Sequence, residues 1–524
     1  MQSLFRRAFG FPIDLRVLSI VRILVAADLM WDWFIRWNIR ELIYFGKGLD
    51  LDFPWYAWKF SFFHISDNPG FRTFLFGVIL LSYFSLLIGY RTRWAAVVSF
   101  FGFISLASFN AELSTAEDSL GQMALFWLIV LPSGMHFSVD RLLGRSCRQG
   151  IVAPTRISSP WAWSIAFQFA VIYLCTGINK HLVQPNGWPS GTAIWGFVLS
   201  PHVGWGLGQL FMQLPGGVLR ALCKVIPYQQ LVMGILFFVP SRWTRLFAVL
   251  GGFALHLGIG TNMWTGDVWF LPICSLCLLI DPDFIDWAIA RFRPGRGTGS
   301  AHSGAGALQV QSRFVLSSFF MLALVYCQIL DIFDQNRKFE VHLPSWIRIP
   351  VIADVERAIF RGQHWAMYTS NVVDLTREVY VAESNQGPID VTSAFEYPWM
   401  LSSVLEAPKI RMEYFISNRA PLLHRRIRDS IHARLTRKGC DTYDSYFEIY
   451  RRRFEDRFPG LKIQRVHIVF VQKRLPEVGD YASLSQRGDE RWFRVNTWTP
   501  HGSPLEFDPS LASLLGPLRG SASE

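Results

Sequence analysis

The sequence predicts a polytopic α-helical membrane bundle of about nine spans, followed by a small extracytoplasmic α+β domain. Hydrophobic residues make up 51% of the 524 residues and charged residues only 17%, against about 25% in soluble domains. The chain also holds 21 Trp and 44 Phe, an aromatic excess that suits membrane interfaces. Long apolar segments, close to the ~20 residues that a membrane-crossing helix needs, recur along the first two thirds of the chain.

These apolar segments define the predicted spans. They cover residues 17–37, 73–90, 94–110, 119–137, 161–179, 221–240, 244–262, 266–281 and 314–332. The segment 221–240 contains Lys224, Pro227 and the pair Gln229-Gln230, so we expect it to be kinked or to begin at the interface. No small-residue cleavage site follows the first segment, which is expected to serve as an uncleaved signal.

Arginines in alternate loops predict the orientation. Every second loop is basic, through Arg6, Arg7, Arg91, Arg93, Arg141, Arg145, Arg148, Arg156, Arg242, Arg245, Arg291, Arg293, Arg296 and Arg313. The positive-inside rule then places the N-terminus in the cytoplasm and the region after the last span outside it. Cytoplasmic loops absorb much of the net charge of +11, so the expected partner is a lipid bilayer and not nucleic acid.

The chain divides by composition. Residues 1–290 form the predicted bundle, 291–312 a flexible Gly- and Ser-rich linker, 313–332 the last transmembrane helix, 333–505 the α+β domain and 506–524 a disordered tail. In the α+β domain, the runs Glu378–Val381 and Val466–Val471 are typical of strands. Residues 421–437 and 443–457 are rich in arginine and are predicted to be helical.

Lys180 is the most informative candidate for a functional residue. The apolar segment that starts at Pro160 ends in Thr-Gly-Ile-Asn-Lys-His at residues 176–181, so Lys180 lies at the rim of a span. Such a lysine is either a snorkelling anchor or a base, because burial among apolar groups favours the neutral amine. Gly177, three residues earlier, would let another helix or a flat ligand approach closely.

Charged residues in or beside the spans form a second group of candidates. Asp32 and Arg36 can pair at i,i+4, which favours a structural ion network with Asp28 and Arg22; a substrate or proton pathway is the alternative. Asp118 follows Glu117 at the outer end of the fourth span, where it either complements the helix dipole or pairs with Lys180 and strengthens its hold on a proton.

His256 lies within the seventh span and needs a partner there, as a structural or a functional group. Seven scattered cysteines predict no disulfide framework. The pair Cys274-x-x-Cys277 has the spacing of a redox or metal site, but it lies among apolar residues without a second ligand pair, so we predict no metal.

Five segments of the first 285 residues resemble a known family. They are the run Asp14–Ala26 around Arg22, the Gly-Tyr-Arg-Thr-Arg-Trp at 89–94, the His-Phe-Ser-Val-Asp-Arg-Leu-Leu at 136–143, the run 173–182 with Lys180 followed by Trp188 and Gly191, and the Phe-Ala-Leu-His-Leu-Gly around His256. In this order they resemble the vitamin K-dependent γ-carboxylase superfamily, also called the HTTM (horizontally transferred transmembrane) domain. The resemblance covers about residues 13–285.

The resemblance implies a function and a site. In the carboxylase, the lysine at the position of Lys180 deprotonates reduced vitamin K, oxygen converts the quinol to an epoxide, and a glutamate side chain is carboxylated. Lys180, Asp118 and His256 are then the expected catalytic residues, and Gly177, Trp188 and Arg22 the expected substrate-binding residues. Asp118 takes the place of a histidine that supports the base in the carboxylase, and the outer domain is smaller than the carboxylase's.

We therefore expect a multi-pass membrane protein that acts on a quinol or another amphiphile at the outer rim of the membrane, with reduced vitamin K or a related quinol as its cofactor. If it is an enzyme, it resembles a γ-carboxylase or quinol epoxidase. The alternative is a non-catalytic membrane protein that binds or scaffolds a lipid or a partner. Transport is a weaker hypothesis, because the sequence shows no internally repeated half.

Overall fold

The computed structural model describes most of the first 292 residues and part of the C-terminal region. The described residues are 12–38, 40–45, 61–109, 116–145, 153–158, 160–182, 187–199, 207–211, 213–239, 241–263, 268–292, 374–385, 387–390, 448, 451–452, 455–456, 459–474 and 490–498.

Five described helices are long and apolar enough to cross a membrane, as in a multi-pass membrane protein. They are α4 (Pro69–Ile88), α5 (Thr92–Phe109), α8 (Pro160–Leu182), α12 (Gly216–Phe238) and α13 (Arg242–Asn262). They match the predicted segments 73–90, 94–110, 161–179, 221–240 and 244–262.

The prediction of nine spans is not confirmed. The first segment forms a 24-residue helix, α2 (Leu15–Asn38), which carries more charged residues than a simple span. The fourth forms only the 15-residue helix α6 (Ala116–Val130), and the eighth only the 8-residue helix α14 (Phe270–Cys277). Helices of 15 and 8 residues are shorter than a bilayer core at 1.5 Å per residue. The predicted span 313–332 lies outside the described residues.

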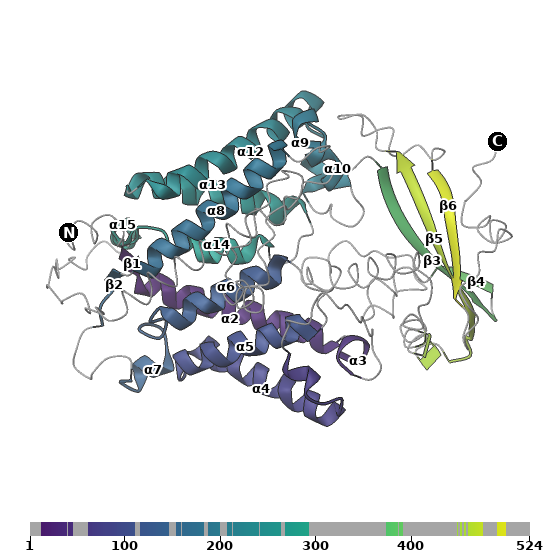
Figure 1. The fold of residues 1–524 in the computed structure, drawn as a ribbon, viewed down its shortest axis with the longest axis horizontal. Coiled ribbons are helices and arrows are strands. Elements are labelled where there is room, and N and C mark those ends of the chain that lie inside the picture. The colour runs from purple at the N-terminus through teal and green to yellow at the C-terminus, as the bar shows by residue number, and fades with distance from the viewer. Residues whose placement is uncertain are drawn as a thin grey trace, which may run out of the picture.

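Short elements connect these helices. They are β1 (Pro12–Asp14), α3 (Arg40–Ile43), the 3₁₀ turn η2 (Phe62–His64), α7 (Val139–Leu142), β2 (Arg156–Ser158), α9 (Gly187–Ser190), α10 (Ala193–Leu199), α11 (Gly208–Phe211) and α15 (Pro282–Phe292). Strands β1 and β2 pair antiparallel and join the start of α2 to the start of α8. Figure 1 shows β1, β2, α7 and α15 toward one end of the bundle, and α3, α9 and α10 toward the other.

Local sequence sets the ends of α4. The side chain of Asn68 accepts hydrogen bonds from the backbone N–H groups of Gly70 and Phe71, and Pro69 occupies the first turn, where a missing N–H costs nothing. At the other end, Gly89 adopts the left-handed conformation with φ +72°, which only glycine takes without strain. The helix therefore begins and ends where its sequence dictates.

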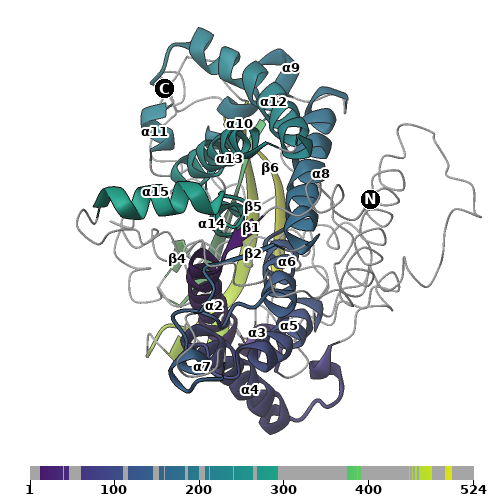
Figure 2. The ribbon, with the colours of Figure 1, turned by 90° about the vertical axis from the view of Figure 1, so that its left-hand side faces the viewer.

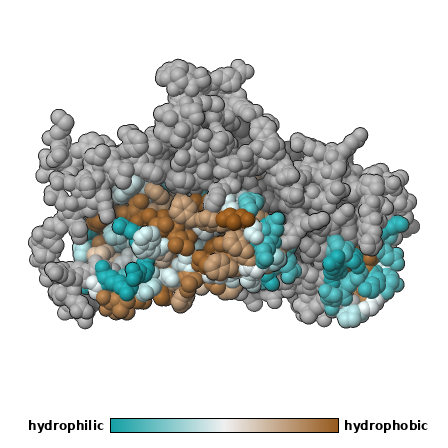
Figure 3. All heavy atoms as spheres, turned by 60° about the horizontal axis from the view of Figure 1, so that its bottom comes forward, coloured by the Kyte–Doolittle hydropathy of each residue, from teal (hydrophilic) through white to brown (hydrophobic). Residues whose placement is uncertain are grey.

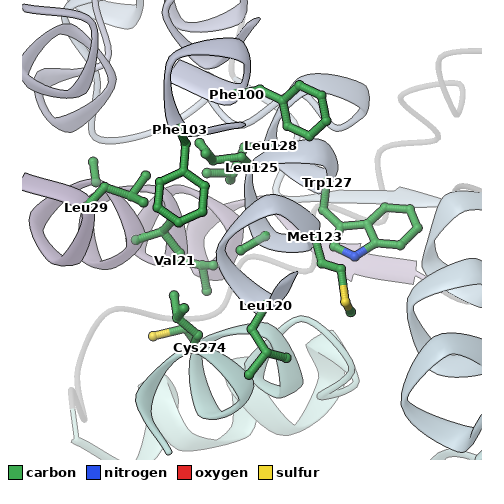
Figure 4. Packing of buried hydrophobic residues seen from close by; sticks show 14 of the residues in the cluster. Val21, Leu29, Phe100, Phe103, Leu120, Met123, Leu125, Trp127, Leu128 and Cys274 are labelled. Carbon is green, nitrogen blue, oxygen red and sulfur yellow. The ribbon is translucent and has the colours of Figure 1, made fainter. Parts of the chain in front are cut away.

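One hydrophobic core joins α2, α5, α6 and α14. Figure 4 shows Phe103 of α5 between α2 and α6, and Cys274 of α14 pointing toward the same cluster. A Cβ added at Gly121 of α6 would come within 2.9 Å of the Phe103 ring, so α5 and α6 are in close contact there. Helix α6 contacts α2, α5, α8 and α14, and Figure 2 shows it next to α2 and α5.

The outer faces of the long helices are apolar. Phe74 and Leu81 on α4, Ile235 on α12, and Phe247 and Leu250 on α13 are exposed to the surroundings of the protein. Figure 3 shows hydrophobic residues over much of the described part of the bundle on the face in view, with hydrophilic patches between them. Such a large apolar surface is stable against lipid and not against water.

Four strands pair in the described C-terminal part. Strands β3 (Asp374–Ser384), β4 (Gly387–Asp390), β5 (Ile463–Arg474) and β6 (Glu490–Trp498) form an antiparallel sheet in the order β4-β3-β5-β6. The two predicted strand runs lie in β3 and β5, and these two strands pair with each other. The α+β domain as a whole stays a prediction. Residues 421–437 lie outside the described residues, as do the tail 506–524 and the linker beyond Phe292; of 443–457, residues 448, 451–452 and 455–456 are described.

Candidate functional site

Lys180 lies in the last turn of α8, and its side chain is buried. The residue is 3% exposed, so its amine does not reach out of the protein as a snorkelling anchor would. A cation near a helix C-terminus interacts favourably with the helix dipole, which gives this position some tolerance for charge. A buried ammonium nevertheless loses most of its hydration.

Both described partners of the Lys180 amine are uncharged. Lys180 Nζ donates a hydrogen bond to Gln230 Oε1 of α12 over 2.9 Å. The same nitrogen lies 4.9 Å from the centre of the Trp188 ring, a cation–π distance. The described partners thus orient the amine without supplying a counter-charge.

Small residues fix the distance between α8 and α12. A Cβ added at Gly177 would come within 2.9 Å of the Leu231 side chain and 3.0 Å of the Pro227 carbonyl oxygen on α12. Reciprocally, a Cβ at Gly234 would come within 2.6 Å of the Leu174 side chain on α8. The close neighbour that Gly177 was expected to admit is therefore a helix, and this contact sets the approach of Lys180 to Gln230.

Two neighbouring amides tie α12 to the helices beside it. Gln230 accepts from Lys180 of α8, and Gln229 Nε2 donates to the carbonyl oxygen of Gly251 on α13 over 3.1 Å. Pro227 lies one turn before them inside α12, where it removes one backbone hydrogen bond of the helix. Gln229 and Gln230, the polar pair that made this segment a weak candidate for a span, thus link α12 to α8 and α13.

The turn around α9 holds Trp188 against the amine. Trp188 is buried, and the backbone N–H groups of Gly191 and Thr192 donate to the carbonyl oxygens of Trp188 and Gly187. Gly191 has φ +82°, so this tight turn needs a glycine. The structure therefore brings together Lys180 and Trp188, two of the predicted site residues.

The residues on either side of Lys180 each leave one polar atom without a partner. Within the described residues, Asn179 Oδ1 and His181 Nε2 are buried atoms that make no hydrogen bond. Buried polar atoms are nearly always paired, by protein, by water or by a ligand. These two atoms mark the end of α8 as a place where a polar group could bind.

His256 has the partner that a histidine in an apolar helix requires. Its Nε2 lies 3.1 Å from the hydroxyl oxygen of Tyr173 on α8, and both residues are buried. Tyr173, Gly177 and Lys180 follow one another at i, i+4 and i+7 and so share one face of α8. Sequence reasoning did not single out Tyr173 or Gln230, although this helical spacing could have found the tyrosine.

Asp118 belongs to a different cluster from the one predicted for it. Its Oδ1 accepts from Arg36 Nη2 over 2.8 Å, and Arg36 Nε also pairs with Asp32 over 2.9 Å. Arg36 Nη1 donates to the Tyr44 hydroxyl. The predicted Asp32–Arg36 pair is confirmed, and it forms a buried ion network between α2 and α6. Asp118 lies in the first turn of α6, where the helix dipole favours a carboxylate.

Arg22 lies in a third cluster, where α2 meets two turns. Its guanidinium donates to the carbonyl oxygens of Ser133 and Phe137, and it packs so closely on Gly89 that no Cβ fits there. Arg22 and Lys180 are not brought together, since the turn beside α7 lies away from α9 in Figure 1. The substrate-binding role expected for Arg22 stays a prediction without contact to Lys180.

Asp140 completes the cluster around Arg22. Its carboxylate accepts from the backbone N–H groups of Arg91 and Thr92 and from the Thr92 hydroxyl, over 2.7 to 2.9 Å. Partial burial raises the pKa of Asp140, but these hydrogen bonds outweigh it and leave the pKa below its ordinary value. The carboxylate therefore stays charged and ties the turn between α4 and α5 to the start of α7.

The five segments that carry the family resemblance gather at two places. The runs around Arg22, at 89–94 and at 136–143 meet in the Arg22 cluster. The runs around Lys180 and His256 meet through Tyr173, which lies on the Lys180 face of α8. Cys274 and Cys277 are free thiols; Cys274 belongs to the same apolar core as Leu120 (Figure 4), and Cys277 packs against this core.

Compared with known proteins, the chain matches no family model, no curated protein and no solved structure.

Proposed function

We propose that this chain is a membrane enzyme of the γ-carboxylase-like (HTTM) type, in which Lys180 acts as a base on a quinol or another amphiphile at the membrane rim. The observation that carries the proposal is the burial of the Lys180 amine between two uncharged partners, Gln230 and Trp188. A lysine that is buried without a counter-charge can accept a proton, whereas a lysine paired with a carboxylate already holds one.

The groups beside the Lys180 amine are of the kinds that would bind a flat ring with hydroxyl groups. Asn179 Oδ1 is a buried acceptor without a partner among the described residues, and the indole of Trp188 offers a flat face beside the amine. A quinol, when bound, supplies a phenolic hydroxyl whose proton a neutral amine can take. Lys180 would take this proton on Nζ, Gln230 would hold the amine in place, and the apolar surroundings would exclude water.

The Arg36 network supports this division of roles. Arg36 neutralises Asp118, which therefore does not need a proton-bound lysine as its partner. An aspartate free to pair with Lys180 would instead have favoured the ammonium.

Loop charge supports an orientation for the site. We infer that the end of the bundle with Arg91, Arg141 and Arg156 faces the cytoplasm, and that Lys180 and the C-terminal region lie on the outer side. Helices α8 and α13 then end, and α6 begins, on the side where the substrate would be deprotonated.

Turnover of reduced vitamin K tests the proposal. The purified protein is incubated with reduced vitamin K, oxygen, a glutamate peptide and labelled bicarbonate, and epoxide and fixed carbon are measured. We expect epoxide from the unchanged protein and none from Lys180→Ala or Lys180→Arg. Epoxide formed equally by Lys180→Ala would reject Lys180 as the base.

A non-catalytic binding protein is the second candidate. Asn179 Oδ1, His181 Nε2 and the Trp188 ring could hold a polar amphiphile without any proton transfer. Quinone binding that Trp188→Ala weakens, with no epoxide under any condition, would favour this function over the enzyme.

A further inference from the structure

Gln230 is the one described side chain that hydrogen-bonds the Lys180 amine, and it does so from a different helix. Gln230 is buried at 4% exposure in α12. Its amide oxygen is an acceptor without charge, so it orients the amine and adds little preference for the ammonium. A carboxylate has almost the same shape but would hold the ammonium by opposite charge. The choice between glutamine and glutamate at this position therefore decides whether a buried lysine is a base or half of an ion pair.

The close contact between α8 and α12 fixes the distance between Lys180 and Gln230. Gly177 lies three residues before Lys180, and Gly234 four residues after Gln230, so both glycines are within about one helical turn of the pair. Each meets atoms of the opposite helix at distances that leave no room for a Cβ. The lysine and glutamine are thus held at bonding distance by the close approach of the two helices.

Helices α8, α12 and α13 carry no carboxylate side chain. Their titratable groups on the turns next to Lys180 and Gln230 are His181 and Tyr228, whose rings contact each other, and the hydrogen-bonded pair of Tyr173 and His256. Gln229, the neighbour of Gln230, turns instead to α13 and donates to Gly251.

We propose that Gln230 is a positioning residue that aims the Lys180 amine at the substrate while leaving it uncharged, and that a carboxylate at this position would switch the base off. The proposal rests on the proposed function, because it assumes that Lys180 works as a base. It adds a residue of α12 to a site otherwise built from α8 and α9.

The test compares the reactivity of one amine in two isosteric variants. The full-length protein is treated in detergent at pH 8 with formaldehyde and a borane reductant, which methylate uncharged amines. Mass spectrometry then gives the extent of Lys180 methylation relative to that of exposed Lys224 on α12. In Gln230→Glu we expect this ratio to fall about tenfold, because an adjacent opposite charge shifts a proton equilibrium by about one to three units, and two units turn a mostly neutral amine into a mostly charged one. In Gln229→Glu, the matched control, we expect less than a twofold change.

Three results would overturn the role of Gln230. The first is a ratio of Lys180 to Lys224 methylation in Gln230→Glu that stays within twofold of the unchanged protein. An isosteric change would give this result if Gln230 only filled space. The second is an equal fall in Gln229→Glu. The third is a Lys180 that resists the reagent in the unchanged protein while Lys224 reacts. If Gln230→Glu does not fold, Gln230→Leu serves instead, and we expect it to keep Lys180 methylation within threefold while it lowers turnover at least tenfold.

The labelling needs no substrate, so its outcome is separate from that of the proposed function. A tenfold fall in Gln230→Glu without any quinol turnover would keep the positioning role and reject the enzyme. Turnover that depends on Lys180, together with unchanged labelling in Gln230→Glu, would keep the enzyme and reject the role of Gln230.

Discussion

At the scale of single residues, a functional group and a structural group differ in what their removal does to stability. The Arg36 network with Asp32 and Asp118 is a set of opposite charges, and removing one partner leaves a buried charge uncompensated. Within the described part of the chain, Lys180 has an amide oxygen and a ring beside its amine and no carboxylate paired with it. Its burial therefore contributes little to stability, which is typical of a residue retained for function.

Replacing Lys180 by methionine tests this difference. We expect Lys180→Met to leave the free energy of unfolding unchanged within about 1 kcal/mol, because an apolar side chain of similar length replaces a polar group that makes one hydrogen bond. The same change should abolish epoxide formation. Thermal unfolding in detergent measures the first effect, with Arg36→Met as the comparison that should destabilise by about 3 kcal/mol or more. If Lys180→Met lowered the free energy of unfolding as much as Arg36→Met does, Lys180 would be a structural residue.

For Asp140 we predict the opposite, a large loss of stability on replacement, because its carboxylate holds two turns together. We expect Asp140→Ala to lower the stability of the protein by about 2–4 kcal/mol, since three hydrogen bonds to a charged acceptor are lost. The pKa of Asp140 is depressed in the folded protein by those hydrogen bonds, against the effect of burial. Its contribution is therefore complete above the ordinary value of 3.8 and disappears as the pH falls below it.

The measurement is the difference in unfolding temperature between the unchanged protein and Asp140→Ala from pH 7 to pH 3. The difference should be constant down to about pH 4 and shrink below it. A difference that grows on acidification would contradict the depressed pKa.

At the scale of elements, the contact between α8 and α12 shows how small residues position large ones. Without a hydrophobic effect between lipid-immersed helices, close packing at glycine and hydrogen bonds such as that of Gln229 to Gly251 hold the helices together. Gly177 and Gly234 admit the opposite helix, and Lys180 and Gln230 then fall within hydrogen-bond distance.

Alanine at these glycines tests the contact. We expect Gly177→Ala and Gly234→Ala each to destabilise by about 1–3 kcal/mol, because the added methyl group meets backbone or side-chain atoms of the opposite helix. Gly258 on α13 is the matched control, since a Cβ there meets no atom within 4 Å. Gly258→Ala should be neutral or stabilise by up to about 1 kcal/mol, because alanine is the better helix former. Equal unfolding temperatures for all three variants would show that the two helices are not tightly held.

Elements also show what the sequence could and could not predict. The spacing of Asp32 and Arg36 predicts their pair, because i,i+4 places both on one face of a helix. The pairing of Arg36 with Asp118 joins residues 82 apart, and no local pattern encodes it. For the same reason the sequence left two roles open for Asp118, complementing the helix dipole or pairing with Lys180, and did not predict its ion pair with Arg36. In the sequence, Gln230 stood out only as a polar residue within a predicted span. Its partner, Lys180, lies on another helix and could not be predicted from the sequence of α12 alone.

At the scale of the whole molecule, hydropathy predicts the existence of the long helices better than their number of crossings. Five described helices have the length and apolarity of a span, whereas α6 and α14 are too short to be spans. Their sequences nevertheless resemble spans, because burial against other helices selects apolar residues as strongly as lipid does. Cys274 and Leu120 illustrate this, since both contribute to an internal core and not to a lipid-facing surface (Figure 4).

The orientation of the bundle is the remaining property that the charges predict. Helix α4 begins next to Asp67, whose side chain is exposed, and ends near the turn that leads to exposed Arg93 at the start of α5. Because arginines accumulate on the cytoplasmic side, we expect Asp67→Cys to react with a membrane-impermeant maleimide on intact cells, and Arg93→Cys only after the membrane is opened. The four described native cysteines are buried or partly buried, and the unchanged protein gives the background. The reverse pattern of labelling would place Lys180 on the cytoplasmic side, because α4 runs antiparallel to the direction inferred for α8, and a substrate at the outer rim would then be out of its reach.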